Sequence, residues 1–189
     1  MSSPTSPITG WPEAGLAGPA SRAEALACFD SLAGVEPEFM IGRWRGAGLP
    51  TGHPLDGVLE ALDWYGKAFE SVDRVHPLLF RTRSGAVIPL DPRFMPVNMA
   101  LRWPALAVSG PVRMAFRAVS GLLRSDKSAA RLQAVTFRGK RSAAMIYDRR
   151  PITDHFRRID DDRLLGLMEM FGMEMPYFFF LSRDRNSRA

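Results

Sequence analysis

The amino-acid sequence predicts a mainly β protein, an antiparallel β-barrel of about eight strands with a few flanking helices. Between residues 131 and 183, apolar segments follow one another with links so short that neighbouring strands must be antiparallel. Several of these segments, such as RLLGLMEMFGM and PYFFFL, are apolar on both faces, which favours strands covered on both sides. An eight-stranded barrel with helices outside meets both conditions, and its interior holds side chains or one small ligand.

The composition favours a single intracellular domain. The 189 residues are 46% hydrophobic, which is enough for a sizeable core, and the single cysteine, Cys28, excludes an internal disulfide framework. No basic segment followed by an apolar run begins the chain, so we expect a cytoplasmic protein. The net charge is +5, but the arginines are scattered and not interleaved with aromatic residues, so we expect no nucleic-acid partner.

The N-terminal part of the chain predicts a tail and then a helix. Residues 1–20 are mostly Ser, Pro, Gly and Ala, which predicts a disordered tail before one folded domain at 21–183. Ser21 and Glu24 have the spacing of a capping box, and they predict a helix that runs to Ala33. Apolar residues at helical spacing give this helix one face that can pack on the barrel.

The first strand is predicted at Phe39–Ala47 and carries an unusual set of glycines. Gly42, Gly46 and Gly48 fall on one face of an extended chain, and Trp44 fills the remaining position on that face. Glycine within a strand marks a bulge, a tight bend or the close approach of another group. We therefore predict the first strand of a barrel, sharply coiled, with the indole plugging its closed end.

The middle of the chain predicts a second helix and a hairpin. Asp56 is interpreted as the cap of a helix that includes Phe69, with Lys67 as a solvated charge near its end. Two strands then follow as a hairpin at Leu78–Arg83 and Ala86–Leu90, with a Ser-Gly turn between them.

Pro111–Arg124 predicts an amphipathic helix. Arg113, Arg117, Ser120 and Arg124 form one stripe along it, and apolar residues occupy the remaining faces. One interpretation is a surface helix packed on the body of the protein. The other is a basic lid that covers a cavity or makes transient contact with an anionic membrane.

The C-terminal third predicts a β-meander whose strands are linked by short turns. The expected strands are Leu132–Arg138, Ser142–Tyr147, Ile152–Ile159, Leu164–Met170 and Tyr177–Ser182.

The string Gly42-x-Trp44-x-x-x-Gly48, followed by TGHPLDG, WYGKAF and VHPLLF, resembles the GXWXXXG-motif domain of bacterial proteins. The later stretch, from AAMIYDRRPITDHF to PYFFFL, is similar to the domain of unknown function 4334 that often follows it. The resemblance covers about residues 39–183 and implies a calycin-like, lipocalin-related barrel. It divides the domain into a motif part at 39–90, a helical insertion or lid at 91–130 and the meander at 131–183. It implies no particular chemistry.

Our leading functional hypothesis is that the barrel lumen binds a small apolar ligand, such as a fatty acyl or terpenoid-like molecule. Strands that are apolar on both faces favour it, and methionine suits adaptable binding walls. An arginine or Tyr147 would hold a polar head group at one end. A homodimer, and an interaction module whose lumen is filled by side chains, both remain open. The expected ligand-binding residues are Trp44, Tyr65, Met145, Phe156, Arg158 and Met168.

The alternative hypothesis is a cofactor-independent isomerase, cyclase or hydratase that acts on an apolar substrate. Asp154 lies in mid-strand on an apolar face, where an acid must be paired, hydrogen-bonded or protonated. It would be the acid or base, with Tyr147 or His53 assisting. Its partner is predicted to be Tyr147, Arg138, His53 or another arginine inside the barrel.

A haem-binding barrel is the third hypothesis, because some calycin barrels with a similar Gly-x-Trp start carry haem. His155, on a predicted strand, would be its axial ligand, although it faces away from Asp154. We expect no metal site, since the three histidines lack the close spacing of a metal-binding motif.

Overall fold

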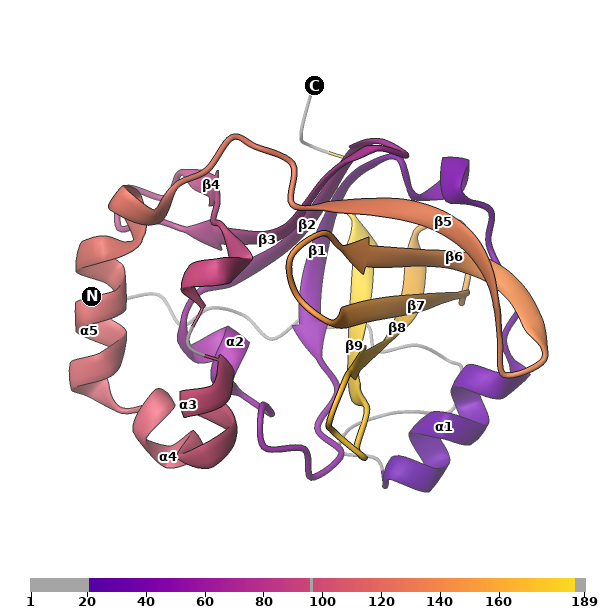
Figure 1. Ribbon diagram of the computed structural model, residues 1–189, viewed down its shortest axis with the longest axis horizontal. Helices are drawn as coiled ribbons and strands as arrows, with labels where there is room; N and C mark the ends of the chain where they lie inside the picture. The colour runs from indigo at the N-terminus through magenta and orange to yellow at the C-terminus, as the bar shows by residue number, and fades with distance from the viewer. Residues whose placement is uncertain (1–20, 96, 186–189) are drawn as a thin grey trace.

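The computed structural model describes residues 21–95 and 97–185, and within them eight antiparallel strands close into a barrel (Figure 1). Consecutive strands in the list below are hydrogen-bonded, and the last pairs with the first. The predicted barrel is thus confirmed, while the predicted tail at 1–20 lies outside the described residues. The strands are β1 (Gly42–Gly48), β2 (Trp64–Ser71), β3 (Arg74–Arg81), β5 (Ala130–Phe137), β6 (Lys140–Tyr147), β7 (Ile152–Arg158), β8 (Arg163–Met170) and β9 (Tyr177–Arg183).

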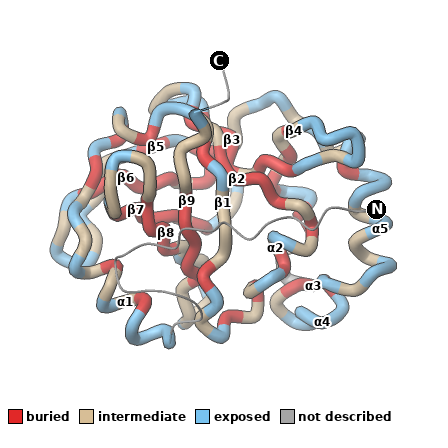
Figure 2. The backbone as a smooth tube through the Cα atoms, turned by 180° about the vertical axis from the view of Figure 1, so that it is seen from behind, coloured by how far each residue is buried: buried red, intermediate tan, exposed pale blue. Residues whose placement is uncertain are grey.

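The barrel has an apolar core inside and a second one outside, which explains why its strands are apolar on both faces. The inner core holds Trp44 and Tyr177 together with several phenylalanines, among them Phe69 and Phe156. The outer core lies between α1 (Arg22–Ser31) and strands β8 and β9, and includes Phe29 and Phe178. Strands β7 and β9, for example, are accordingly buried along most of their length (Figure 2). Helix α1 begins with the predicted capping box.

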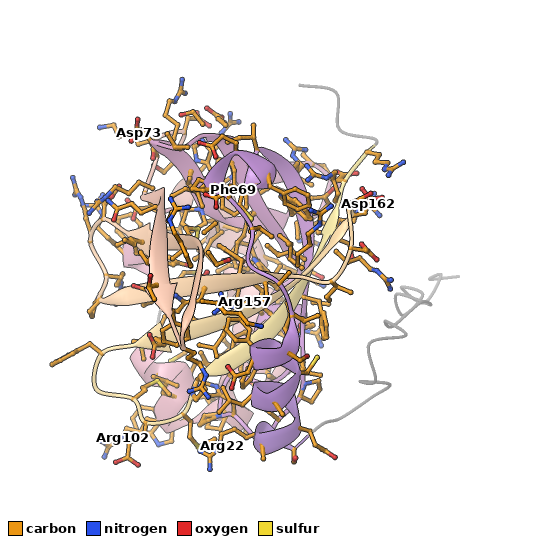
Figure 3. The ribbon with its side chains drawn as sticks, turned by 90° about the vertical axis from the view of Figure 1, so that its right-hand side faces the viewer. Arg22, Phe69, Asp73, Arg102, Arg157 and Asp162 are labelled. Atoms are coloured by element: carbon orange, nitrogen blue, oxygen red, sulfur yellow. The ribbon has the colours of Figure 1, made fainter. Side chains whose placement is uncertain are left out.

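A fully buried arginine lies in the outer core, next to α1 (Figure 3). The guanidinium of Arg157 is 4.6 Å from the centre of the Phe29 ring, and its Nη2 donates a hydrogen bond of 2.8 Å to the carbonyl of Phe137. Burial lowers the pKa of Arg157. The outer side of β7 is therefore a structural contact with α1 and faces away from the lumen.

Trp44 is fully buried in the inner core, next to the segment that precedes the first strand. The short 3-10 helix η1 (Pro37–Met40) occupies the first part of the expected strand, so β1 begins only at Gly42. The buried indole Nε1 donates a hydrogen bond of 2.7 Å to the carbonyl of Met40, and the guanidinium of Arg183 lies 4.2 Å from the indole ring. These contacts fix the indole in place.

The helix predicted from Asp56 to Phe69 is wrong. Only α2 (Val58–Ala61) is helical, and the residues from Trp64 onward form β2 between β1 and β3. Asp56 is not a helix cap, because its Oδ2 accepts hydrogen bonds from three backbone N–H groups in the preceding loop. Pairing with β1 and β3 satisfies the backbone of β2 and buries Trp64 and Phe69 in the inner core, so tertiary structure overrides the local pattern.

Helices cover the side of the barrel where β3 and β5 separate. These two strands pair only at Val75 and Ala130, because the far half of β3 pairs with β4 (Val87–Pro89), which completes the predicted hairpin. The covering elements lie together at one side of the molecule (Figure 1). They are η2 (Pro92–Phe94), α3 (Val97–Arg102), α4 (Pro104–Ala107), α5 (Gly110–Val119) and η3 (Ser120–Leu123).

The arginine stripe of α5 includes residues that hold the helix on the body of the protein. Arg113 Nε donates a hydrogen bond of 3.0 Å to the carbonyl of Ala61, and Arg117 Nε lies 2.6 Å from a carboxylate oxygen of Asp63. The cover also exposes large apolar side chains, most of all Met114 and Leu122. Among the described residues, no helix has both the length and the apolar character that crossing a bilayer requires.

Candidate functional site

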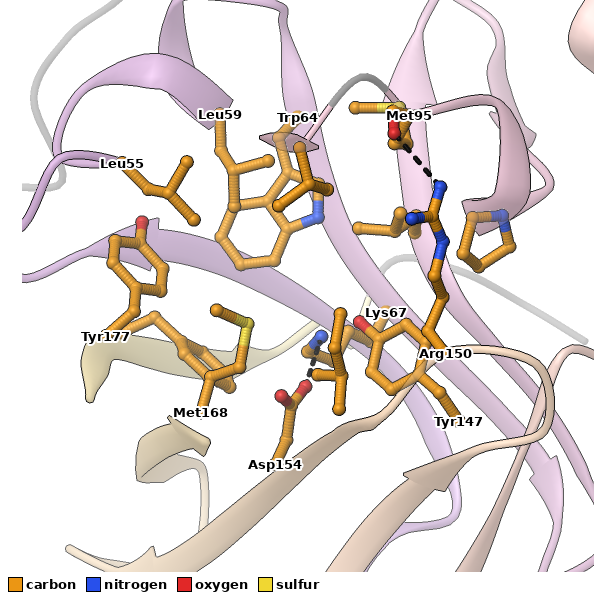
Figure 4. A pocket seen from close by; sticks show the side chains of 15 residues that line it. Leu55, Leu59, Trp64, Lys67, Met95, Tyr147, Arg150, Asp154, Met168 and Tyr177 are labelled. Atoms are coloured by element: carbon orange, nitrogen blue, oxygen red, sulfur yellow. Dashed lines mark hydrogen bonds and ion pairs between the residues drawn. The ribbon is translucent and has the colours of Figure 1, made fainter. Parts of the chain in front are cut away.

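An apolar cavity of about 70 Å³ lies inside the barrel, beneath the helical cover (Figure 4). Its walls come from strands β2, β3 and β6–β9, from the loop between β6 and β7, from α2 and the loop before it, and from the start of the cover. The lining residues are Leu55, Leu59, Trp64, Lys67, Leu78, Pro92, Met95, Val97, Tyr147, Arg150, Ile152, Asp154, Met168, Tyr177 and Phe179.

A buried ion pair forms part of the lining of this cavity. The Nζ of Lys67 lies 2.8 Å from Oδ2 of Asp154, and the two side chains are 4% and 1% exposed (Figure 4). The same Nζ donates a hydrogen bond of 3.2 Å to the carbonyl of Pro77. Neither carboxylate oxygen has a well-aligned hydrogen bond among the described residues, so the ammonium is the principal partner of Asp154.

An irregularity in β2 brings Lys67 to the interior. Trp64 and Lys67 are three residues apart and would face opposite sides of a regular strand. The pairing of β2 with β3 shifts register on both sides of Gly66, whose φ is +143°, and both side chains therefore point inward. A Cβ at Gly66 would overlap the carbonyl oxygen of Trp44, so only glycine fits there.

Aromatic rings surround the Lys67 ammonium. Its Nζ lies 5.6 Å from the centre of the Trp64 ring, 5.9 Å from that of Tyr147 and 5.0 Å from that of Phe179. At these distances the ring faces attract a cation and offset part of the cost of burying it. Trp64 itself lies against Gly46 of β1, where any Cβ would overlap its ring. The glycines of the first strand thus make room for the aromatic wall of the cavity.

Burial sets the protonation behaviour of the cavity. It raises the pKa of Asp154, while the charge of Lys67 and its hydrogen bond act in the opposite direction. It also raises the pKa of Tyr147 and of Tyr177 well above the usual value, and the charge of Asp154 adds to the rise in both. The Tyr177 hydroxyl is buried without a hydrogen-bond partner among the described residues. The site therefore combines a carboxyl group of raised pKa with neutral phenols inside an apolar cavity.

A second apolar cavity of about 70 Å³ lies between α2 and helices α3–α5. It shares four lining residues with the first cavity: Leu55, Leu59, Met95 and Val97. These side chains form the wall between the two spaces. Leu59 and Met95 belong to this shared lining, and the methionine side chain is flexible.

The structure brings together three of the residues predicted from the sequence. Asp154, Tyr147 and Met168 all line the cavity. Met145 and Phe156 are fully buried in the inner core but do not line it. The predicted arginine partner of Asp154 is wrong, because the partner is a lysine.

Three predicted binding residues lie elsewhere. Trp44 is fixed in the inner core, as described above. The Tyr65 hydroxyl donates a hydrogen bond to Asp184 on the outside of the barrel, because Tyr65 faces away from Trp64 in β2. Arg158 is exposed and forms an ion pair with Asp161, because it is the last residue of β7 and lies beyond the lumen, over the ring of Phe39.

His53 supports the wall of the cavity and does not line it. Its ring centre lies 5.4 Å from that of Tyr177, and its Nδ1 accepts a hydrogen bond of 3.0 Å from the backbone N–H of Leu55. Burial lowers the pKa of His53, against the opposing effects of Asp56 and of the Met175 carbonyl. His53 therefore packs behind Tyr177, which lines the cavity, and does not itself reach it.

His155 lies outside the lumen. Its ring stacks on Phe137 at 3.7 Å, and its Nε2 is 3.0 Å from a carboxylate oxygen of Glu169. It is therefore not placed to be the axial ligand of a haem in the lumen, and the cavity is far smaller than the several hundred cubic ångströms of typical cofactor sites. Within residues 21–95 and 97–185, no cluster of three or more His, Cys, Asp or Glu side chains could hold a metal ion.

The sequence interpretation missed Lys67, Trp64, Tyr177 and Arg150. Lys67 was assigned to a helix end, where a lysine is normally solvated. The signal for its true position is the register of β1 and β2, in which Lys67 is directly opposite the inward-facing Trp44. The local sequence reveals neither this register nor the irregularity at Gly66 in the pairing of β2 with β3, which turns Trp64 inward as well.

Comparisons with known proteins agree with this architecture. Residues 27–85 match the family described as GXWXG protein, and residues 128–183 match the domain of unknown function (DUF4334). No curated protein matches the chain. A crystal structure of a protein from Thermomonospora curvata is similar, with 34% sequence identity, a TM-score of 0.66 and coverage of 89% of this chain and 90% of that chain. The chain therefore belongs to the family in which a GXWXG domain is followed by a DUF4334 domain.

Proposed function

We propose that this protein binds a small apolar ligand in the barrel lumen, in contact with the Lys67–Asp154 pair. The observation that carries the proposal is the cavity itself, whose walls are almost entirely aliphatic and aromatic and contain one buried ion pair. Pockets of this composition, apolar with a few convergent polar groups, are typical of small-molecule sites. A fatty acyl or terpenoid-like chain has the matching chemistry.

The size of the cavity determines how such a ligand fits. A space of about 70 Å³ is smaller than an engineered cavity of about 150 Å³ that holds benzene. A chain of eight or more carbons therefore needs the second cavity as well. Movement of Leu59 and Met95 would open it, with the helical cover shifting outward to admit the ligand.

A series of straight-chain alcohols from butanol to dodecanol tests this proposal by isothermal titration calorimetry. Each methylene buried contributes about 0.8 kcal/mol, so the dissociation constant should fall about fourfold per carbon until the chain outgrows the joined cavities. Leu59→Trp fills the space and should abolish binding of the long alcohols. Leu122→Trp makes the same change at an exposed position of the cover and should leave binding intact.

Two results would count against ligand binding in the lumen. One is that no alcohol of any length binds. The other is that Leu59→Trp and Leu122→Trp bind the alcohols equally well, which would place the binding on the surface. Met168→Phe offers a second cavity-filling variant on the opposite wall, if Leu59→Trp does not fold.

The buried carboxyl group favours a second candidate function, a cofactor-independent isomerase. Asp154 would remove a proton from one carbon of the apolar ligand and return it to another, so that no atom is gained or lost. Its raised pKa suits a group that must exchange protons near neutral pH. Lys67 would stabilise the carboxylate form, and Tyr147 or Tyr177 would donate a hydrogen bond to a polar group of the substrate. A cyclase or hydratase would use the same acid.

Deuterium exchange tests catalysis without knowledge of the product. The protein is incubated in D₂O with the apolar compound extracted from it, and the compound is analysed by mass spectrometry. An enzyme should place deuterium on carbon, and Asp154→Asn should abolish the exchange while Asp161→Asn, an exposed carboxylate, should not. Equal exchange by wild type and Asp154→Asn would remove Asp154 as the acid or base.

Membrane contact and dimer formation remain predictions. Because Arg113 and Arg117 contact the body of the protein, a membrane would meet the apolar face of the cover, which exposes Met114 and Leu122. Exposed apolar residues of this kind are found at lipid and protein contacts.

A further inference from the structure

A polar pocket of about 290 Å³ adjoins the mouth of the apolar cavity. Pro92, Tyr147 and Arg150 line both spaces. The close view of the apolar cavity shows Tyr147 and Arg150 side by side at its edge (Figure 4). A single ligand could therefore extend from the apolar interior into the polar pocket past these side chains.

The polar pocket is positively charged. Arg93, Lys127, Arg149 and Arg150 line it together with two carboxylates, Asp91 and Asp148, so cations outnumber anions by two. Both carboxylates are already engaged, because Asp91 pairs with Arg93 at 2.6 Å and Asp148 pairs at 3.0 Å with an arginine that does not line the pocket. Lys127, Arg149 and Arg150 form no direct ion pair with another described residue, although the charge of Arg149 contributes, after Arg93, to the lowered pKa of Asp91.

Arg150 is held in place at the boundary between the two spaces. Its Nη2 donates hydrogen bonds to the carbonyls of Arg93, at 2.8 Å, and of Met95, at 3.2 Å. These bonds use one nitrogen of the guanidinium and leave other N–H donors for a ligand. A fixed, half-buried guanidinium is well suited to bind an anion, since little side-chain freedom is lost on binding.

We propose that the ligand of this barrel is an amphipathic anion, with its apolar chain in the lumen and a carboxylate or phosphate head group in the basic pocket of Arg149, Arg150 and Lys127. This inference rests on the proposed lumen-binding function and specifies the substrate class. It gives the polar head a site that the apolar cavity cannot provide.

The interior ion pair is a poorer site for the head group. Asp154 already neutralises Lys67 at 2.8 Å, so an anion there would meet a carboxylate as well as an ammonium. Complete removal of a charged head from water is also costly unless it is fully paired. The outer pocket provides unpaired cations and access to water, and it leaves only the chain to be buried.

Three probes with the same ten-carbon chain test the inference by calorimetry at pH 7.5: 1-decanol, decanoate and decyl phosphate. We expect both anions, or the one with the preferred head group, to bind at least about tenfold more tightly than decanol, as for a charge-assisted hydrogen bond. Raising the salt concentration should weaken the anions and not decanol. The ratio of decanoate to decyl phosphate identifies the head group.

Arg149→Gln and Lys127→Gln remove cations that do not line the apolar cavity. Each should weaken the anions about tenfold and leave decanol unchanged. Arg141→Gln, an exposed arginine paired with Glu36 and outside this pocket, is the matched control and should change nothing. Equal loss for all three probes would indicate a structural effect and contradict the inference.

The remaining outcomes separate the two proposals. Equal affinity for decanol and both anions overturns the inference and leaves apolar binding in the lumen intact. Binding of no probe overturns the lumen-binding function and the inference together. Tight binding of anions that Leu59→Trp does not affect would place the whole ligand outside the lumen, and it would also overturn the inference.

Discussion

Replacing Lys67 by methionine tests whether the interior of the barrel is as dry as its burial indicates. The substitution keeps the length of the side chain and removes its charge. The Nζ of Lys67 lies 2.8 Å from the carboxylate of Asp154. At that distance and an effective dielectric constant of about 20, two unit charges attract by about 6 kcal/mol. Desolvation of the two ions opposes this by several kcal/mol each, so the pair as a whole contributes little net stability.

Lys67→Met is expected to lose much more stability than the intact ion pair contributes. Lys67→Met should lower the free energy of unfolding by about 3–5 kcal/mol near pH 7, because it leaves Asp154 buried without its partner. The double variant Lys67→Met/Asp154→Leu should regain most of this loss, since apolar residues can replace a buried pair at little cost. Urea unfolding followed by tryptophan fluorescence measures all three values.

The loss should also depend on pH with a definite sign. Burial raises the pKa of Asp154 and Lys67 opposes the rise, so without Lys67 the folded-state pKa lies further above the unfolded value of about 3.9. A raised folded-state pKa means that the folded protein binds the proton more tightly. This contribution to stability is complete below the unfolded pKa and is lost as the pH rises through the folded pKa. The deficit of Lys67→Met should therefore shrink as the pH is lowered from neutral.

An exposed ion pair provides the control. Arg141 and Glu36 are 63% and 60% exposed, so Arg141→Met should cost less than about 1 kcal/mol. If Lys67→Met costs no more than Arg141→Met and shows no dependence on pH, the pair is hydrated in solution. The description of a dry, charged cavity would then be refuted.

Three further predictions follow from packing and burial. Gly46→Ala should lower the free energy of unfolding, measured by thermal unfolding, by about 1–3 kcal/mol, because its Cβ would overlap the Trp64 ring. Gly121→Ala has open space around the new Cβ and should be neutral or slightly stabilising. Burial lowers the pKa of His53 in the folded protein. Its contribution to stability is therefore complete above the unfolded pKa of about 6.5 and is lost as the pH falls through the folded pKa. His53→Gln should make the free energy of unfolding less dependent on pH on the acid side. Ser142→Ala should cost about 1–3 kcal/mol in urea unfolding, because the buried N–H of Val35 loses its hydrogen-bond partner and the carbonyl of Phe156 loses one of its two side-chain donors. A loss below a few tenths of a kcal/mol would contradict this.

Strong local patterns made most of the barrel predictable. The strands of the meander are apolar, bounded by turn residues and linked too briefly for any arrangement but an antiparallel one. Ser21 and Glu24 likewise determine the start of α1 through bonds within one helical turn. Each of these signals acts between neighbours in the sequence and needs no knowledge of the rest of the fold.

The candidate site was only partly predictable. Asp154 stood out because an acid on an apolar face requires a partner, and Met168 because methionine suits adaptable binding walls. The identity of the partner depended on which strand faces Asp154 across the lumen. Lys67 occupies that position because the backbone at Gly66 shifts the register of β2.

The sequence by itself determined an antiparallel barrel, an apolar interior and one acid that had to be satisfied inside it. Only the tertiary structure decided that residues from Trp64 to Ser71 form a strand and that a lysine neutralises Asp154. It also decided that a basic pocket adjoins the mouth of the cavity. The physical reason is that period and turn chemistry act locally along the chain, whereas pairing register and charge contacts join residues far apart in sequence, whose proximity exists only once the barrel has closed.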